Sequence, residues 1–165
     1  LLALGGRAAT LACTHDWNSD ACRIERLLQQ NDLMQARYLV AARDPDGYPL
    51  AEALLLRAAP LDRRGETAFY RAVLAIRRGQ PASEVLPLLE EAAAADHPHA
   101  IALLYKLYRE PLLLARPDSV QAQRYREAYD RLDVARSGYP PFEKALQVVT
   151  QLIGEPPPPA QRQGD

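Results

Sequence analysis

Serine and lysine are scarce in this 165-residue chain, and both shortages restrict its function. Only four serines occur, three of them better explained as helix caps or turn residues, and no Gly-x-Ser-x-Gly sequence exposes a nucleophile. Lysine occurs only at Lys106 and Lys144, and no basic stripe with interleaved aromatic residues indicates a nucleic-acid interface. A Gly-rich phosphate-binding loop is also missing. We therefore expect no enzyme, no cofactor and no nucleic-acid partner.

Aromatic residues and long apolar runs are scarce as well. Only two Phe and one Trp accompany a hydrophobic content of 48%, so the core must consist mainly of Leu and Ala, which are strong helix formers. β-branched residues are sparse, and the alternation typical of strands is missing. No run approaches the ~20 apolar residues that a membrane-spanning helix needs. The composition predicts one all-α domain without a transmembrane segment.

Arginine supplies nearly all the positive charge. Twenty basic and twenty-one acidic side chains leave a formal net charge of −1, so the chain has no strong global field. Arg pairs bidentately with carboxylates and stacks on aromatic rings, which suits protein interfaces. A GC-rich genome would produce the same excess of Arg, so this bias alone identifies no interface.

Cys13 and Cys22 are the only cysteines. An even count with a short spacing fits a disulfide formed in an oxidising compartment, and this bond would hold the N-terminal segment on the first helix. Two free thiols are the alternative. Zinc with His15 as a third ligand is a weaker one, because three ligands at one loose spacing make a poor structural site, and we expect no metal.

The N-terminal stretch up to Cys13 is apolar and rich in small residues, like the tail of a secretory leader. It also loosely resembles a lipoprotein processing site, although Thr10 stands where such a site prefers Leu. Arg7 interrupts the apolar run, and an ordinary N-terminal helix or tail remains the alternative. Together with the cysteine pair, this stretch leads us to expect the periplasm or envelope of a Gram-negative bacterium.

A repeating register occupies the middle of the chain. The small and large apolar residues Ala92, Ala100 and Leu104 follow the spacing of two packed antiparallel helices, and Tyr108 extends the series. A similar spacing starts at Ala68, 32 residues before Ala100. Self-similarity at a period of roughly 20–50 residues is typical of stacked solenoids, in which each unit covers the apolar face of its neighbour. We expect a right-handed α-α superhelix (solenoid) of about seven or eight antiparallel helices.

Capping and turn residues divide the chain into an irregular segment (1–18), a helical repeat domain (19–153) and a Pro-rich tail (154–165). Ser19 or Asp20 is expected to cap the first helix, and residues 30–32 to break it. Ser83 and either Asp118 or Ser119 are natural caps further along. The expected helices are listed by their approximate ranges: 20–29, 32–43, 49–59, 66–78, 84–95, 98–109, 119–135 and 141–153.

These units resemble Sel-one-like repeats, the bacterial relatives of the tetratricopeptide family. The resemblance covers about residues 66–135 well and 20–65 only weakly, and it rests on the small residues at Ala92, Ala93 and Ala100, the apolar Leu104 and the aromatic Tyr108. It departs from the family pattern where Tyr105 replaces the usual Gly and where three Leu follow Tyr108. Known roles of the family include envelope scaffolds, signalling adaptors and immunity proteins against secreted toxins such as type VI lipase effectors. The resemblance implies a non-enzymatic protein-binding module, with an immunity protein as first choice and an envelope scaffold or assembly lipoprotein as the alternative.

The predicted binding residues flank one loop of the best repeat. In the repeat register Tyr105 and Arg109 follow core positions by one residue and should therefore face outward. Tyr129 is expected to reach solvent nearby, and interfaces favour Tyr and Arg because both give large contacts with a polar end. The leucines 112–114 either form an exposed apolar anchor or fold back over the core. The complete predicted site is Tyr105, Arg109, Leu112, Leu113, Leu114 and Tyr129.

Overall fold

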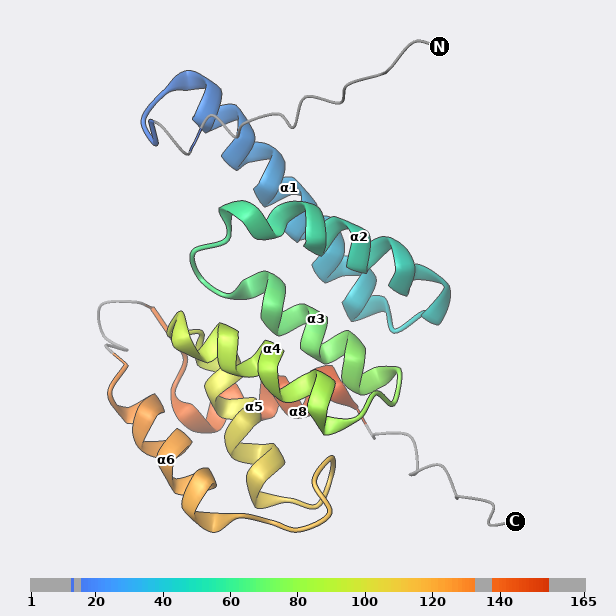
Figure 1. The fold of residues 1–165 in the computed structure, drawn as a ribbon, viewed down its shortest axis with the longest axis vertical. Coiled ribbons are helices and arrows are strands. Elements are labelled where there is room, and N and C mark those ends of the chain that lie inside the picture. Colours follow the sequence, from blue (N-terminus) through green and yellow to red (C-terminus); the bar gives the residue numbers. More distant parts are fainter. Residues whose placement is uncertain (1–12, 14–15, 133–137, 155–165) are drawn as a thin grey trace, which may run out of the picture.

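The chain is all-helical in the computed structural model, which describes residues 13, 16–132 and 138–154 (Figure 1). Within these residues there are seven α-helices and no strand, which confirms the predicted fold class. None of these helices is both long and apolar enough to cross a bilayer. The helices are α1 (Asp20–Ala42), α2 (Tyr48–Ala58), α3 (Glu66–Arg77), α4 (Ala82–Ala94), α5 (Pro98–Arg109), α6 (Ser119–Asp130) and α8 (Phe142–Ile153).

The first six of these helices stack in chain order, as the repeat register predicts. α1 packs mainly against α2, α3 against α4, and α5 against both α4 and α6. Figure 1 shows α1 and α2 at one end, α3 and α4 in the middle, and α5 and α6 at the other end. α8 does not extend the stack but turns back onto α5 and α3. It therefore covers one side of the middle and last layers.

The repeat register is visible in the burial pattern. Ala68 and Ala72 of α3, and the equivalent Ala100 and Leu104 of α5, are all buried. Tyr108 is half-buried, and its ring stacks on that of Tyr125 with centroids 5.7 Å apart. The small residues let neighbouring helices approach closely, while the large ones fill the space between layers.

One close approach needs a glycine. Gly65 precedes α3 with φ 70°, a conformation that L side chains adopt rarely. A Cβ at this position would lie 2.7 Å from Cα of Ala92, which is itself fully buried in α4. The start of α3 therefore rests directly on the backbone of α4. Ala92 belongs to the register because a larger residue there would separate the two helices.

α1 is one continuous helix, so the predicted break at residues 30–32 is wrong. Asp32 is 4% exposed, and its carboxylate accepts hydrogen bonds from Nε and Nη2 of Arg57 at 2.7 and 2.5 Å. This pairing links α1 to α2 and satisfies a polar group that would otherwise favour a turn. A tertiary contact thus overrides the local preference of the sequence.

Most helix ends follow the predicted capping residues. Ser19 caps α1 by accepting from the amide of Cys22, and Asp118 caps α6 by accepting from the amides of Val120 and Gln121. The predicted cap at Ser83 is wrong, because α4 already begins at Ala82, directly after Pro81. The seventh expected helix (119–135) ends earlier than expected, because α6 ends at Asp130 and Arg131 is its C-cap. The tail after Gly154 lies outside the described residues.

Arginine side chains hold the end of α8 against the stack. Nε of Arg77, on α3, donates to the carbonyl of Leu152 at 2.8 Å, and its terminal nitrogens donate to the carbonyls of Leu152 and Val40. Arg43, just after α1, donates to the carbonyl of Gln151. Positive charge at a helix C-terminus satisfies its last carbonyls and complements its dipole. These bonds join α1, α3 and α8.

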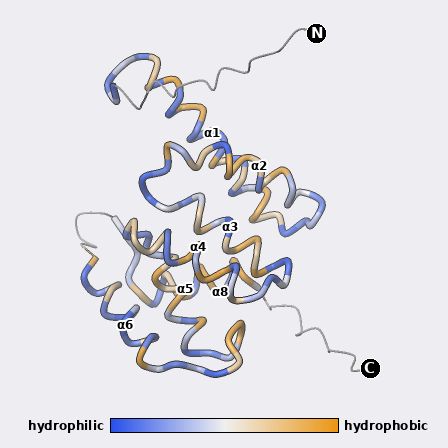
Figure 2. The backbone as a smooth tube through the Cα atoms, viewed as in Figure 1, coloured by the Kyte–Doolittle hydropathy of each residue, from blue (hydrophilic) through white to orange (hydrophobic). Residues whose placement is uncertain are grey.

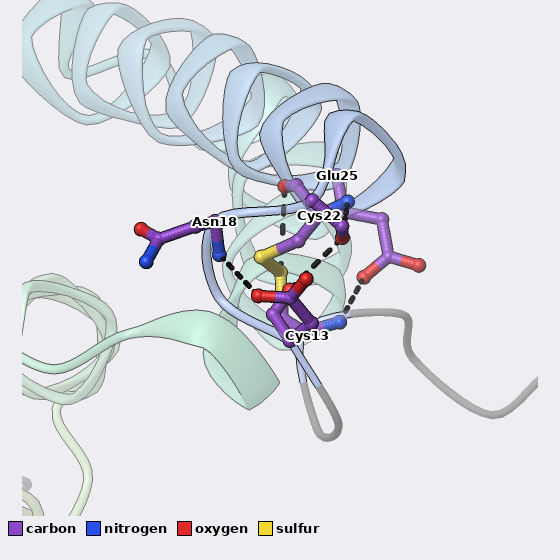
Figure 3. The surroundings of a disulfide bond; sticks show 6 residues. Cys13, Asn18, Cys22 and Glu25 are labelled. Atoms are coloured by element: carbon purple, nitrogen blue, oxygen red, sulfur yellow. Dashed lines mark hydrogen bonds between the residues drawn. A yellow bond between two sulfur atoms is a disulfide. The ribbon is translucent and has the colours of Figure 1, made fainter.

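Cys13 and Cys22 form the predicted pair, with sulfur atoms 1.98 Å and Cα atoms 4.6 Å apart (Figure 3). Cys22 is fully buried in the first turn of α1, so the pair holds Cys13 on that turn. The amide of Cys13 also donates to a carboxylate oxygen of Glu25 at 3.4 Å. The other residues before position 16, including Thr10 and His15, lie outside the described residues.

Candidate functional site

Tyr105 and Arg109 line the same surface hollow, about 610 Å³ in volume, between α5 and α8. They stand one helical turn apart on α5, and the Arg109 guanidinium lies 5.8 Å from the centre of the Tyr105 ring. We call this feature the α5–α8 hollow. Its other lining residues are Lys106, Glu110, Glu143, Leu146, Gln147, Thr150 and Gln151.

Tyr105 is half-buried, whereas Arg109 is exposed. The Tyr105 ring meets Phe142 edge-on with centroids 5.0 Å apart, so the first residue of α8 fixes the orientation of the ring. Lys106 pairs with Glu110 at 2.7 Å across the same turn of α5. The hollow therefore has a fixed aromatic wall and an exposed guanidinium.

The three loop leucines do not form a free apolar anchor. Leu112, Leu113 and Leu114 are all half-buried, and the first two pack against the main core. Figure 2 shows this loop as a hydrophobic stretch between α5 and α6. Of the two alternatives that the sequence left open, folding back over the core describes Leu112 and Leu113. None of the three lines the α5–α8 hollow.

Tyr129 is only 2% exposed, so the expectation that it reaches solvent is wrong. Its hydroxyl donates to the carbonyl of Pro140 at 2.5 Å, and its ring meets Phe142 edge-on at 5.1 Å. Pro140 and Phe142, at the start of α8, lie against Tyr129, and a sequence register for stacked repeats does not place them there. Tyr129 and Tyr105 share a contact with Phe142, but only Tyr105 belongs to the hollow.

A second, larger groove lies across α4, α5 and α6, with a volume of about 850 Å³. We call it the α4–α6 groove. Ile101, only 2% exposed, lines it together with the basic Arg124 and Arg131 and the acidic Glu90 and Asp96. The sequence analysis missed this groove because its walls come from separate helices. Its other lining residues are Ala93, Ala94, Tyr125, Ala128, Leu132 and Tyr139.

The stacked pair Tyr108 and Tyr125 lies beside this groove. Burial raises the pKa of Tyr125, and the nearby carboxylate of Glu90 raises it further. The pKa of Tyr108 is raised by the same two causes in the same order. Both hydroxyls therefore stay protonated at neutral pH and can donate hydrogen bonds.

His97 has a structural role at the start of α5. Its ring stacks on Phe69 with centroids 4.7 Å apart, and Nδ1 accepts the amide proton of Ala100 at 3.2 Å. Burial, with a smaller contribution from His99, lowers the pKa of His97 to about 3, so the neutral ring caps the helix. Among the described residues, no three His, Cys, Asp or Glu side chains are grouped closely enough to hold a metal ion.

No family model, curated protein or solved structure matches this chain. The resemblance to Sel-one-like repeats therefore rests on the register of Ala92, Ala93, Ala100, Leu104 and Tyr108 alone. The membership itself remains a hypothesis.

Proposed function

We propose that this chain is a non-enzymatic protein-binding module of the Sel-one-like type, which docks a protein partner over the α5–α8 hollow. One observation carries the proposal: Tyr105 and Arg109, expected from the sequence to face outward, stand together on the wall of one hollow. Tyr and Arg are the side chains that most often dominate the binding energy at protein interfaces.

The neighbours of Tyr105 hold its ring in one orientation, which favours binding. Phe142 supports the ring from one side, and the Arg109 guanidinium lies over it. A ring that is already held in place loses little conformational entropy when a partner covers it. The exposed part of the Tyr105 side chain offers apolar area, and a Tyr hydroxyl can form a hydrogen bond.

The charges around the hollow suit a polar protein surface. Arg109 provides an exposed cation, while Lys106 and Glu110 neutralise one another. Glu143 and Gln147, both exposed on α8, provide acceptor and donor groups on the opposite wall. A partner with a carboxylate near an apolar residue would complement this arrangement, since a guanidinium binds a carboxylate through two parallel hydrogen bonds.

The most specific form of the proposal is an immunity protein that blocks a secreted antibacterial toxin, such as a type VI lipase effector. Such an inhibitor acts by covering an active site and needs no chemistry of its own. The pair Cys13–Cys22 supports an oxidising location, so we propose the periplasm as the compartment.

The test compares two double variants in binding to those products of the neighbouring genes that prove toxic when exported to the periplasm. Replacing Tyr105 and Arg109 by Ala should weaken binding and inhibition at least tenfold, about 1.4 kcal/mol, without changing the helical content. The matched control, Tyr139→Ala with Arg131→Ala, removes the same side-chain types from the α4–α6 groove and should bind like the parent. If only the control variant loses binding, the partner uses the other groove and the assignment to Tyr105 and Arg109 is wrong.

A further inference from the structure

α1 carries a second apolar face on its outer side. Its inner residues Leu33, Ala36 and Val40 are buried against the other helices. On the opposite side, five large apolar side chains are more than half exposed, and Figure 2 shows hydrophobic and hydrophilic residues alternating along this helix. We call this set the outer stripe: Ile24 (57% exposed), Leu27 (58%), Leu28 (60%), Met34 (53%) and Tyr38 (72%).

The outer stripe lies at the end of the stack, where a solenoid normally presents a polar surface. Residues 16–19, just before α1, do not cover it, because the ring centre of Trp17 lies 4.8 and 3.6 Å from the guanidinium carbons of Arg26 and Arg63 instead. Arg26 is two residues after Ile24 and therefore lies on another side of the helix. The apolar face is thus open in the described part of the chain.

The spacing along the stripe is that of a coiled coil. Ile24, Leu27, Asn31, Met34 and Tyr38 follow one another at alternating steps of three and four residues, the a and d positions of consecutive heptads. Asn31, at the central a position, is exposed. A single Asn at such a position fixes the register and the number of strands, because it can hydrogen-bond to its own copy.

We propose that two copies of this chain associate through their outer stripes as a short parallel coiled coil. In this arrangement each a residue faces the same residue of the second copy, so the two Asn31 amides meet at the middle of the interface. The proposal concerns the opposite end of the stack from Tyr105 and is independent of the proposed function. A dimer would present two α5–α8 hollows, one at each far end.

The charges flanking the stripe favour the parallel arrangement. It sets Arg23 beside Leu28 of the second copy, Gln30 beside Gln35 and Arg37 beside Ala42, so no like charges meet along the flanks. An antiparallel pair with superposed stripes would instead set Arg23 near Arg37 of the second copy, twice by symmetry. Glu66 pairs with Arg37 at 3.8 Å and offsets part of its charge, but the two arginines still carry the same sign. Like charges side by side are destabilising.

One contact at the end of the helix opposes the parallel arrangement. It brings Asp20 near its own copy, but this residue is in the exposed first turn of α1, and Arg23 lies 3.9 Å from it. Water and the adjacent Arg screen such a pair. The parallel arrangement thus has one like-charge contact, whereas the antiparallel arrangement has two, each partly offset by an adjacent ion pair.

The available area suits a dimer of modest affinity. Each of the five exposed side chains presents on the order of 100 Å² of apolar surface, so two copies would bury roughly 1,000 Å² in total, the lower end for specific interfaces. α1 is already folded and held by its inner face, so the association needs no helix nucleation. We expect a dimer that dissociates on dilution.

The first experiment measures the mass of the full chain in solution by analytical ultracentrifugation across a concentration series. The parent should change from monomer to dimer, and Leu27→Glu should raise the dissociation constant at least tenfold. Leu56→Glu is the control, since Leu56 is 50% exposed on α2 outside the stripe, and it should associate like the parent. A parent that stays monomeric, or a Leu27→Glu variant that still dimerises, overturns the proposal.

The second experiment tests the direction of the helices by cysteine cross-linking under mild oxidation. In a parallel dimer, Ile24→Cys and Tyr38→Cys should each form a covalent dimer with its own kind. In an antiparallel dimer neither should do so alone, and only a mixture of the two variants should cross-link. That second result would contradict the parallel arrangement. Circular dichroism of each variant establishes that it is folded.

Discussion

The unfolding free energy of this protein should fall as the pH is lowered from 7 to 5, because His97 is buried in its neutral form. Its pKa is lowered from 6.5 to about 3, chiefly by burial. The unfolded chain binds a proton at this imidazole below pH 6.5, whereas the folded chain does so only near pH 3. The contribution of neutral His97 to the unfolding free energy is therefore fully present above pH 6.5 and is lost progressively as the pH falls towards 3.

The magnitude follows from the difference in proton uptake. For one such group, each pH unit in this window lowers the free energy of unfolding by about 1.4 kcal/mol. Lowering the pH from 6.5 to 5 should therefore lower it by about 2 kcal/mol. His99 acts in the same direction, since burial also lowers its pKa. A protonated His97 would also lose the acceptor atom that caps α5 at the amide of Ala100.

The assay is urea unfolding at pH 7 and pH 5, followed by circular dichroism, for the parent and for His97→Asn. Asn is a good capping residue that does not titrate, so the variant keeps the cap and removes the pH-dependent group. The variant should be less stable than the parent at pH 7, because it loses the stacking on Phe69, but should lose about 2 kcal/mol less on acidification. An equal loss in both proteins would refute the role of His97.

Three further perturbations test how the helices are held together, the first two by thermal and chemical unfolding and the third by hydrogen exchange. Gly65→Ala should lower the free energy of unfolding by more than about 2 kcal/mol, because the added Cβ would clash with the α4 backbone. Gly138→Ala should lower it by only about 1 kcal/mol, the cost of a left-handed backbone conformation, because nothing lies within 4 Å of the added Cβ. Arg77→Met should lower the free energy of unfolding by about 2 kcal/mol, because it removes the charged donor to carbonyls at the ends of α1 and α8. Reducing the Cys13–Cys22 pair should lower amide protection in the first turn of α1 and leave the protection of α5 unchanged, as measured by hydrogen exchange; a loss throughout the stack would contradict this local role.

The helices were predictable wherever burial alone determines them. Ala68, Ala72, Ala100 and Leu104 are spaced for one inward face, and the structure buries all four. The continuity of α1 was not predictable, because residues 30–32 favour a turn locally and are held in the helix by a contact from α2. The position of α8 was equally hidden, since its contacts join residues far apart in the chain.

In the candidate site, too, features set by one helix were predictable and features set by contacts between helices were not. The exposure of Arg109 follows from the register of its own helix, whereas Tyr105 is half-buried because Phe142 of α8 packs against its ring. Tyr129 is buried beside Phe142 and the carbonyl of Pro140, a placement that no helical periodicity reveals. The α4–α6 groove needs three helices to be placed relative to one another, and the outer stripe was hidden because Ile24 and Leu27 have the spacing of a core face.

Direct binding of a toxin tests the central claim, that this chain is a protein-binding inhibitor acting through the α5–α8 hollow. The purified chain is titrated calorimetrically into each product of the neighbouring genes that proves toxic in the periplasm, and the residual toxin activity is measured at every step. One toxin should bind with a defined stoichiometry and lose its activity in parallel, and the variant lacking the Tyr105 and Arg109 side chains should need at least tenfold more protein for the same inhibition. Equal inhibition by parent and variant, or no binding to any of these toxins, would contradict the claim.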